Sequence, residues 1–456
     1  MVATTTEQST SLRRRLVNGT LWNFLAAVCN QGSTFAVSVL VARVLGKQGF
    51  GEYAILQNTL ATITFLIQLS MGFTATKFVA EYRSVDRDRT GRILGMCALV
   101  SGVMAVVGAV ALAAGATVLA GQALHAPHLT AGLRVGALYL LFAAINAFQV
   151  GALIGLEATA EVATAGIASG LFTLVAVTAG VLRGQLLGAV CGLALAALVR
   201  CAIHHLLLHR AMRRQGLRFS FAQLGAERHI LLQFALPAAL AGYYSQPAIW
   251  LVNAMLVKQP GGFAQMALYG AATSVRQLVL FLPNVINTVG LSVLNHERGA
   301  GHGRQYYRVF RANILTILGV SLVVAGMLAI GAGWILALFG KDFHAGQPVV
   351  WWLLLSTIPE SLSIALFQDL QSRGQIWQAL FSINIPRETL FVVLAWRWIP
   401  HLGAVGVARA YLLVWIFALG IVAVMTLRQN PPIFFSLRAA RTDPREPVLI
   451  AAAGGR

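Results

Sequence analysis

Charged residues are scarce in this chain of 456 residues. They make up 11% of the sequence, whereas 57% of the residues are hydrophobic and the mean hydropathy is +0.73. So few charged side chains cannot cover the surface of a soluble globule of this length. The composition therefore excludes a soluble globular protein and predicts an integral membrane protein.

Motifs for metal, redox or nucleophilic chemistry are also missing. The cysteines lie inside apolar stretches without the spacing of metal ligands, so we interpret them as small buried hydrophobic residues: Cys29, Cys97, Cys191 and Cys201. His204, His205 and His209 fit no ligand set, and we interpret them as a solvated cytoplasmic edge. The sequence has neither a phosphate-binding loop nor a nucleophile with its base. We therefore expect no cofactor, no metal site and no enzymatic activity.

Long apolar runs, in contrast, are abundant. A helix needs about 20 apolar residues to cross a bilayer, and runs of this length recur without the alternation of barrel strands. We predict an all-α membrane protein with twelve transmembrane helices, at residues 18–42, 53–76, 93–120, 131–156, 160–182, 184–207, 229–257, 266–295, 312–340, 348–371, 375–399 and 402–427.

The basic residues orient the predicted helices. Because the number of spans is even, both termini lie on one side of the membrane. Most Lys and Arg residues then cluster on that side, at residues 13–15, 77–92, 210–228, 298–311 and beyond 428. Since short cytoplasmic loops carry an excess of basic residues, we predict an N-in, C-in topology. The net charge of +19 is then explained by topology and by anionic lipid headgroups, without a nucleic-acid partner.

A polar stretch divides the chain into two halves. Residues 209–228 form the longest internal polar segment, with six predicted spans on either side. We therefore predict an N-terminal lobe at 1–208, a cytoplasmic linker at 209–228, a C-terminal lobe at 229–427 and a cytoplasmic tail at 428–456. Similar segments follow the first and the seventh span, LGKQGFGEYAILQN at 45–58 and VKQPGGFAQMALYGAAT at 257–273, as a repeat of the two halves requires.

The opening segments resemble Wzx-type polysaccharide flippases. In that family the first loop typically reads A-R-x-L-G-x-x-x-F/Y-G-x-Y, which this chain matches at Ala42, Arg43, Leu45, Gly46, Phe50, Gly51 and Tyr53. The second helix typically ends in K-x-x-A-E-x-R, which is matched at Lys77, Ala80, Glu81 and Arg83. Chain length, span count and the lack of loop domains extend the resemblance to the whole chain.

The resemblance implies a fold and a function. The family belongs to the multidrug/oligosaccharidyl-lipid/polysaccharide exporter (MOP) superfamily, which implies a MATE-like fold of two six-helix lobes and rocker-switch alternating access. The implied activity is flipping of an undecaprenyl-pyrophosphate-linked oligosaccharide from the inner to the outer leaflet of the bacterial inner (cytoplasmic) membrane. The expected partners are this substrate, membrane lipids and, functionally, a polysaccharide polymerase and glycosyltransferases. We expect the chain to act as a monomer.

Ionisable residues inside the predicted spans are the strongest functional signal. Each costs at least ~2.5–3.5 kcal/mol at mid-bilayer, so it normally faces a partner or a hydrated cavity. Spans of the second half carry Arg276, Glu360, Asp369, Arg387, Glu388 and Arg409. Because arginine stays charged and binds phosphate bidentately, we predict that the three arginines make a central cleft cationic. The three carboxylates then orient the arginines or titrate during transport.

Polar stripes on two predicted helices are expected to line the same cleft. At about 100° per residue, Arg276 and Asn287 lie roughly 20° apart on their helix, with Asn284 beside them. In the first span, Asn30 falls within roughly 20° of Asn23 by the same period. We therefore expect these asparagines to hydrogen-bond the substrate.

Other interpretations stay open. The buried charges could pair only to hold the bundle together, for example Arg387 with Glu360 or Arg409 with Glu388, and only the shallower Arg200 would then lack a carboxylate. The chain could also be an ion-coupled multidrug exporter of the same superfamily, but that branch mostly handles cations and its cleft should be acidic. A membrane-embedded polysaccharide polymerase or ligase needs a larger external loop than the sequence provides.

Overall fold

The computed structural model describes residues 3–222, 224–299, 303–372 and 375–429. Within these ranges the chain is helical apart from short turns and contains no strand. By length and composition, seven of the described helical stretches can cross a membrane: Ala27–Ile67, Arg87–Ala123, Pro127–Gly155, Thr159–Arg214, Gln305–Ile330, Lys341–Gln371 and Trp377–Arg428. The predicted all-α, multi-pass membrane protein is therefore confirmed.

Three helices change direction at a glycine. The backbone leaves the helical region at Gly46 in α1 (Ala3–Ile67), at Gly184 in α5 (Thr159–Arg214) and at Gly403 in α14 (Ile385–Gln429). Gly46 has φ = 66°, a value that a residue with a Cβ rarely adopts, so the turn of α1 requires glycine there. The predicted loop at 43–52 is therefore wrong, because one helix runs into the next through this single residue.

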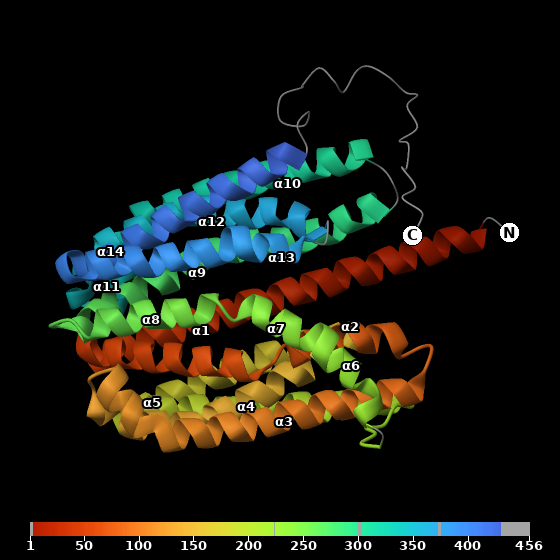
Figure 1. The fold of residues 1–456 in the computed structure, drawn as a ribbon, viewed down its shortest axis with the longest axis horizontal. Helices are drawn as coiled ribbons and strands as arrows, with labels where there is room; N and C mark the ends of the chain where they lie inside the picture. Colours follow the sequence, from red (N-terminus) through yellow and green to blue (C-terminus); the bar gives the residue numbers. More distant parts are fainter. Residues whose placement is uncertain (1–2, 223, 300–302, 373–374, 430–456) are drawn as a thin grey trace.

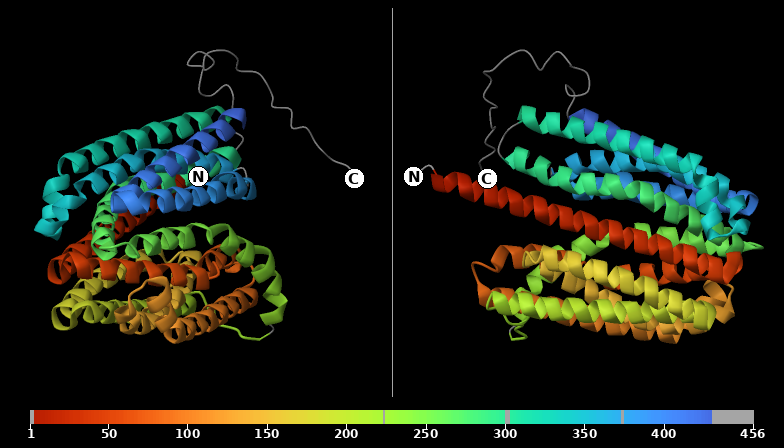
Figure 2. Two further views of the ribbon diagram at one scale, coloured as in Figure 1. Left: turned by 60° about the vertical axis from the view of Figure 1, so that its left-hand side comes forward. Right: turned by 180° about the vertical axis from the view of Figure 1, so that it is seen from behind.

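The helices form two layers, which are clear in Figure 1 and from two further directions in Figure 2. The N-terminal bundle consists of α1, α2 (Met71–Tyr82), α3 (Arg87–Val118), α4 (Thr130–Gly155) and α5. The C-terminal bundle consists of α8 (Ser245–Val257), α9 (Gly262–Gly299), α10 (Gly303–Ile330), α11 (Ala332–Phe339), α12 (Gln347–Ser372), α13 (Ile376–Ala379) and α14. Between the layers, α1 contacts α8, α9 and α11.

Short helical turns complete the connections. They are η1 (Leu119–Ala123), η2 (Pro127–Leu129), η3 (Leu224–Glu227), α6 (Arg228–Ile230), η4 (Leu231–Ala235), α7 (Leu236–Gly242), η5 (Lys341–Gly346) and η6 (Leu380–Asn384). The π-helical turn η6 directly precedes Pro386, near the start of α14. Such turns re-satisfy backbone groups that a proline leaves free.

The segment that joins the bundles packs on the N-terminal bundle. The carboxylate of Glu227 is buried and pairs with Arg89 at 3.3 Å and with Arg92 at 3.5 Å, both on α3. The ring of Phe234 in η4 lies 5.2 Å from the ring of Phe78 in α2. In this segment η3 therefore lies against α3 and η4 against α2. The seventh predicted span is interrupted, because α8 starts only after a break at residues 243–244.

Two of the four cysteines, all of which we predicted to be buried, are not buried. Cys97 and Cys201 are buried, but Cys29 and Cys191 are exposed, so their interpretation as buried residues was wrong. Apolar residues of a membrane protein also cover its outer surface, so burial does not follow from hydrophobicity there. The predicted tail lies outside the described residues from residue 430 onward.

Candidate functional site

A cavity of about 420 Å³ lies between the two bundles. Its lining comes from α1, α4 and α5 on one side and from α8, α9 and α14 on the other. Hydroxyl and amide side chains predominate among its polar groups, with Arg276 as its cation. We call it the central cavity.

A second cavity, of about 390 Å³, continues from the central cavity into the N-terminal bundle. The two cavities share Thr34, Gln57, Tyr139 and Leu193 in their lining. We call the second one the N-terminal cavity; its cation is Arg200. Among the described residues, no Asp or Glu lines either cavity.

Arg276 of α9 lines the central cavity, and its guanidinium donates to side chains of α12 and α14. Its Nη1 donates to Oε2 of Glu360 at 2.6 Å and to the hydroxyl oxygen of Tyr411 at 2.9 Å. The Tyr411 hydroxyl in turn donates to Oε1 of Glu360 at 3.1 Å. Glu360 is buried in α12, where Pro359 precedes it, and it is not part of the cavity wall. The charge of Arg276 is therefore largely compensated before any substrate binds.

Arg387 lies away from both cavities. Its guanidinium donates to Oε1 of its neighbour Glu388 and, at 3.2 Å, to Oγ of Ser245, and it lies 4.3 Å from the ring centre of Trp415. The considered pairing of Arg387 with Glu360 is therefore wrong. Adjacent side chains project about 100° apart on a helix, but arginine is long enough to reach back to its neighbour.

Arg409 also lies outside the described lining of both cavities. Its guanidinium carbon is 5.0 Å from the ring centre of Trp352. Its Nε is buried, with no hydrogen-bond partner in the described part of the chain. The considered ion pair between Arg409 and Glu388 is not formed, since Glu388 pairs with Arg387.

The predicted asparagines separate into different environments. Asn30 lines the N-terminal cavity. Asn284 is exposed and lines a small pocket between α1 and α9, together with Gln31 and Gln277. The side chain of Asn23 lies outside the described residues.

Asn287 and Asp369 lie inside the C-terminal bundle. The Nε2 of Gln368 donates to the backbone oxygen of Asn287 at 2.6 Å and to its Oδ1 at 3.0 Å. Asp369 is fully buried and accepts a hydrogen bond of 2.6 Å from the Tyr306 hydroxyl. These polar groups join α9, α10 and α12, and the structure does not bring them to the central cavity.

Residues in and beside the N-terminal cavity include some that the sequence analysis did not select. Arg200 donates from Nη2 to Oγ1 of Thr173 at 3.3 Å. His204, one turn further along α5, is only 3% exposed, and its Nδ1 lies 2.9 Å from Nδ2 of Asn146. The interpretation of His204 as a solvated edge was therefore wrong. The signal was present, because the i, i+4 spacing of Arg200 and His204 places both on one helix face.

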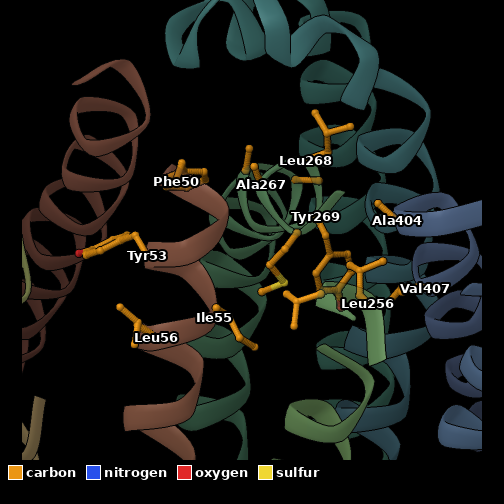
Figure 3. Close-up of a cluster of buried hydrophobic side chains, with 14 of the residues drawn as sticks. Phe50, Tyr53, Ile55, Leu56, Leu256, Ala267, Leu268, Tyr269, Ala404 and Val407 are labelled. Atoms are coloured by element: carbon orange, nitrogen blue, oxygen red, sulfur yellow. The ribbon is translucent and has the colours of Figure 1, made fainter. Parts of the chain in front are cut away.

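Aromatic side chains close the central cavity at the end where α1 turns. Phe50 lies 6.0 Å from Phe339 and 5.8 Å from Phe343, measured between ring centres. Figure 3 shows Phe50 near Ala267 and Leu268 at one end of the buried cluster that joins α1 to α9. Since Phe50 also lines the central cavity, this cluster forms its closed end.

Backbone contacts tighten the same closure. A Cβ on Gly51 would overlap the carbonyl oxygen of Phe263, so the two bundles meet here at backbone distance. Nε of Arg43 donates to the carbonyl oxygen of Leu338 at 2.6 Å, in the last turn of α11, where helix carbonyls lack intrahelical partners. Segments 45–58 and 257–273, which are similar in sequence, therefore face each other across the interface.

Known structures with this fold are membrane transporters. A multidrug resistance MATE family transporter of the MOP superfamily, in an inward-facing conformation, has a TM-score of 0.77 at 13% identity, with 91% of this chain and 98% of that chain covered. A MOP superfamily transporter from Pyrococcus furiosus, described with a binding pocket of reverse polarity, scores 0.70 at 15% identity, with 91% and 95% covered. The lipid II flippase MurJ scores 0.71 at 13% identity, with 90% and 87% covered. These likenesses confirm the predicted MATE-like fold.

Sequence comparison assigns the family. Curated protein sequences give no match. The family model described as polysaccharide biosynthesis protein matches residues 16–294, which is more than half of the chain. The resemblance carried by the first loop and the second helix is therefore confirmed, and the chain belongs to the polysaccharide biosynthesis protein family.

Proposed function

We propose that this protein flips an anionic lipid-linked oligosaccharide, of the undecaprenyl-pyrophosphate class, from the inner to the outer leaflet of the bacterial cytoplasmic membrane. One observation carries the proposal: two joined cavities contain arginines and, among the described residues, no carboxylate in their lining. Their volumes, about 390 and 420 Å³, lie within the ~300–1,000 Å³ of small-molecule sites.

The chemistry of such a substrate matches the lining. Its phosphates need cations, and its sugar hydroxyls need hydrogen-bonding groups that replace water. The guanidinium groups supply the first, and the amides and hydroxyls of both cavities supply the second. Gln277 lines both the central cavity and the pocket between α1 and α9, so we expect the substrate to enter along this seam with its lipid tail outside.

The alternatives lack this support. An exporter of cationic drugs needs carboxylates in its cavity, and the acid-free lining disfavours it. A polymerase or ligase needs catalytic groups on an extramembrane loop, and the connections between the described transmembrane helices are short. Glycosyltransferases would supply the proposed substrate, and a polymerase would use it.

Transfer of a labelled substrate between leaflets tests the proposal. In proteoliposomes that contain the purified chain, a fluorescent lipid-linked oligosaccharide in the inner leaflet is expected to become accessible to an impermeant quencher. Protein-free liposomes control for spontaneous transfer, which is slow because the headgroup is charged. Efflux of a cationic dye without transfer of the oligosaccharide would favour a multidrug exporter over the flippase.

We further propose twelve spans with both termini in the cytoplasm. The turns in α1, α5 and α14 divide each of these helices into two spans, and the distribution of Lys and Arg supports the orientation. In a variant without the native cysteines, Pro260→Cys is expected to react with an impermeant maleimide in intact cells. Arg213→Cys is expected to react only after permeabilisation, and the reverse pattern would refute the orientation.

A further inference from the structure

The membrane arginines differ in how their charge is compensated. Arg276 pairs with Glu360 and Arg387 pairs with Glu388. Arg200 and Arg409 form no ion pair with any residue that the structure describes, and of these two only Arg200 lines a cavity. An uncompensated cation within an apolar bundle is costly unless an anion or water reaches it.

The Arg200 guanidinium is positioned but not saturated. Thr173 donates its hydroxyl proton to the carbonyl oxygen of Ser169 at 2.7 Å, so its oxygen is free to accept from Nη2 of Arg200. Nε of Arg200 is buried and has no hydrogen-bond partner among the described residues. Thr173 therefore fixes the guanidinium while other donors remain available to a ligand.

The surrounding walls offer further donors. Asn30, Ser33 and Asn146 line the same cavity as Arg200. The amide nitrogen of Asn146 is already engaged by His204 at 2.9 Å and by Gln149 at 3.4 Å, both outside the described lining, so the donors on the wall are the side chains of Asn30 and Ser33. A cation, an amide and hydroxyls around one void constitute an arrangement that binds phosphate oxygens, with Asn30 as the amide.

We propose that Arg200 is the phosphate-binding residue and that the N-terminal cavity holds the pyrophosphate, while the central cavity holds the sugars. This assignment rests on the proposed function and adds the orientation of the substrate, with its two ends in different cavities. Arg276 is the weaker candidate because Glu360 already compensates its charge, and Glu360 and Tyr411 already accept from its Nη1. A phosphate in the N-terminal cavity supplies the counter-charge that Arg200 lacks among the described residues.

Binding of farnesyl pyrophosphate, with farnesol as its uncharged counterpart, tests the assignment on the full-length protein in nanodiscs. Arg200→Gln is expected to weaken binding of the pyrophosphate by about 10–100-fold and to leave farnesol binding unchanged, because charge-assisted hydrogen bonds are lost. Arg200→Lys keeps the charge but loses the planar fork, so we expect an intermediate affinity. Arg397→Gln removes an exposed cation of α14 and serves as the matched control, with wild-type affinity expected.

The outcomes separate this assignment from the proposed function. Wild-type pyrophosphate affinity in Arg200→Gln, or an equal loss in Arg397→Gln, overturns the role of Arg200. A loss specific to Arg200→Gln, in a protein that nevertheless fails to transfer lipid-linked oligosaccharide, keeps the phosphate site and overturns the flippase function. Thr173→Val, which removes only the fixing hydroxyl, is expected to weaken pyrophosphate binding less than Arg200→Gln does, and a larger loss contradicts a direct contact with Arg200.

Discussion

Gly51→Val is expected to hold the central cavity open at the end where α1 turns and to abolish transport. The new side chain overlaps the Phe263 carbonyl oxygen, so the bundles must separate here. Overpacking of this kind costs about 1–3 kcal/mol, which shifts the balance between closed and open states by about 5–150-fold. The rate at which an impermeant maleimide labels Ser274→Cys, in the wall of the central cavity, measures the change in a cysteine-free background.

A matched glycine substitution controls for general damage to a helix. Gly102 lies in α3, and a Cβ built there has no neighbour within 4 Å. Adding Gly102→Val to the Ser274→Cys protein is therefore expected to leave its labelling rate unchanged. Phe50→Ala loosens the same closure without a clash, because it removes the ring contacts to Phe339 and Phe343, and should also speed labelling. If Ser274→Cys is labelled as slowly with Gly51→Val and with Phe50→Ala as it is without them, this contact does not close the cavity.

Removal of Arg276 alone is expected to destabilise the protein more than removal of the whole ion pair. Arg276→Met leaves Glu360 buried without its cation, a change that typically costs about 3–5 kcal/mol. Adding Glu360→Gln removes the unpaired charge and should restore most of the thermal stability of the detergent-solubilised protein. Transport should remain at least about tenfold reduced in the double variant, because the two joined cavities have lost one of their two arginines.

The comparison of single and double variants decides what the pair does. Equal thermal stability of Arg276→Met and the double variant would show that Glu360 is not left uncompensated. Full transport in the double variant would make the pair structural only. Lys258→Met is the control, since it removes an exposed basic residue just after α8.

Helix positions followed from the sequence because a membrane span must be apolar over its whole length. The predicted gaps near residues 183 and 400–401 lie within three residues of the turns at Gly184 and Gly403. The turn at Gly46 was harder to place, because the polar residues around it suggested a loop. One glycine with positive φ replaces that loop, and only the backbone geometry reveals this.

Charge partners did not follow from the sequence. Arg276 and Glu360 are 84 residues apart, and whether they meet depends on the rotation of α9 and α12 about their axes. Arg200 was judged shallow because the predicted span ended at 207, whereas α5 continues to Arg214. Hydrophobic periodicity reports which face of a helix is polar, but not which other helix that face meets.

Under the rocker-switch motion that the family resemblance implies, the contacts of Glu227 with α3 restrict where the chain can bend. Because Arg89 and Arg92 anchor this carboxylate and Phe234 of η4 packs on Phe78, we expect the segment from η3 to η4 to move with the N-terminal bundle. Tyr243 is also tied to α1, since its ring lies 6.1 Å from that of Phe65 and its hydroxyl donates to the carbonyl oxygen of Leu66, so we expect the bend at the break just before α8. A bend at this position would let the bundles rotate while the ion pairs of Glu227 stay intact. The backbone would then change conformation only at residues without charged side chains.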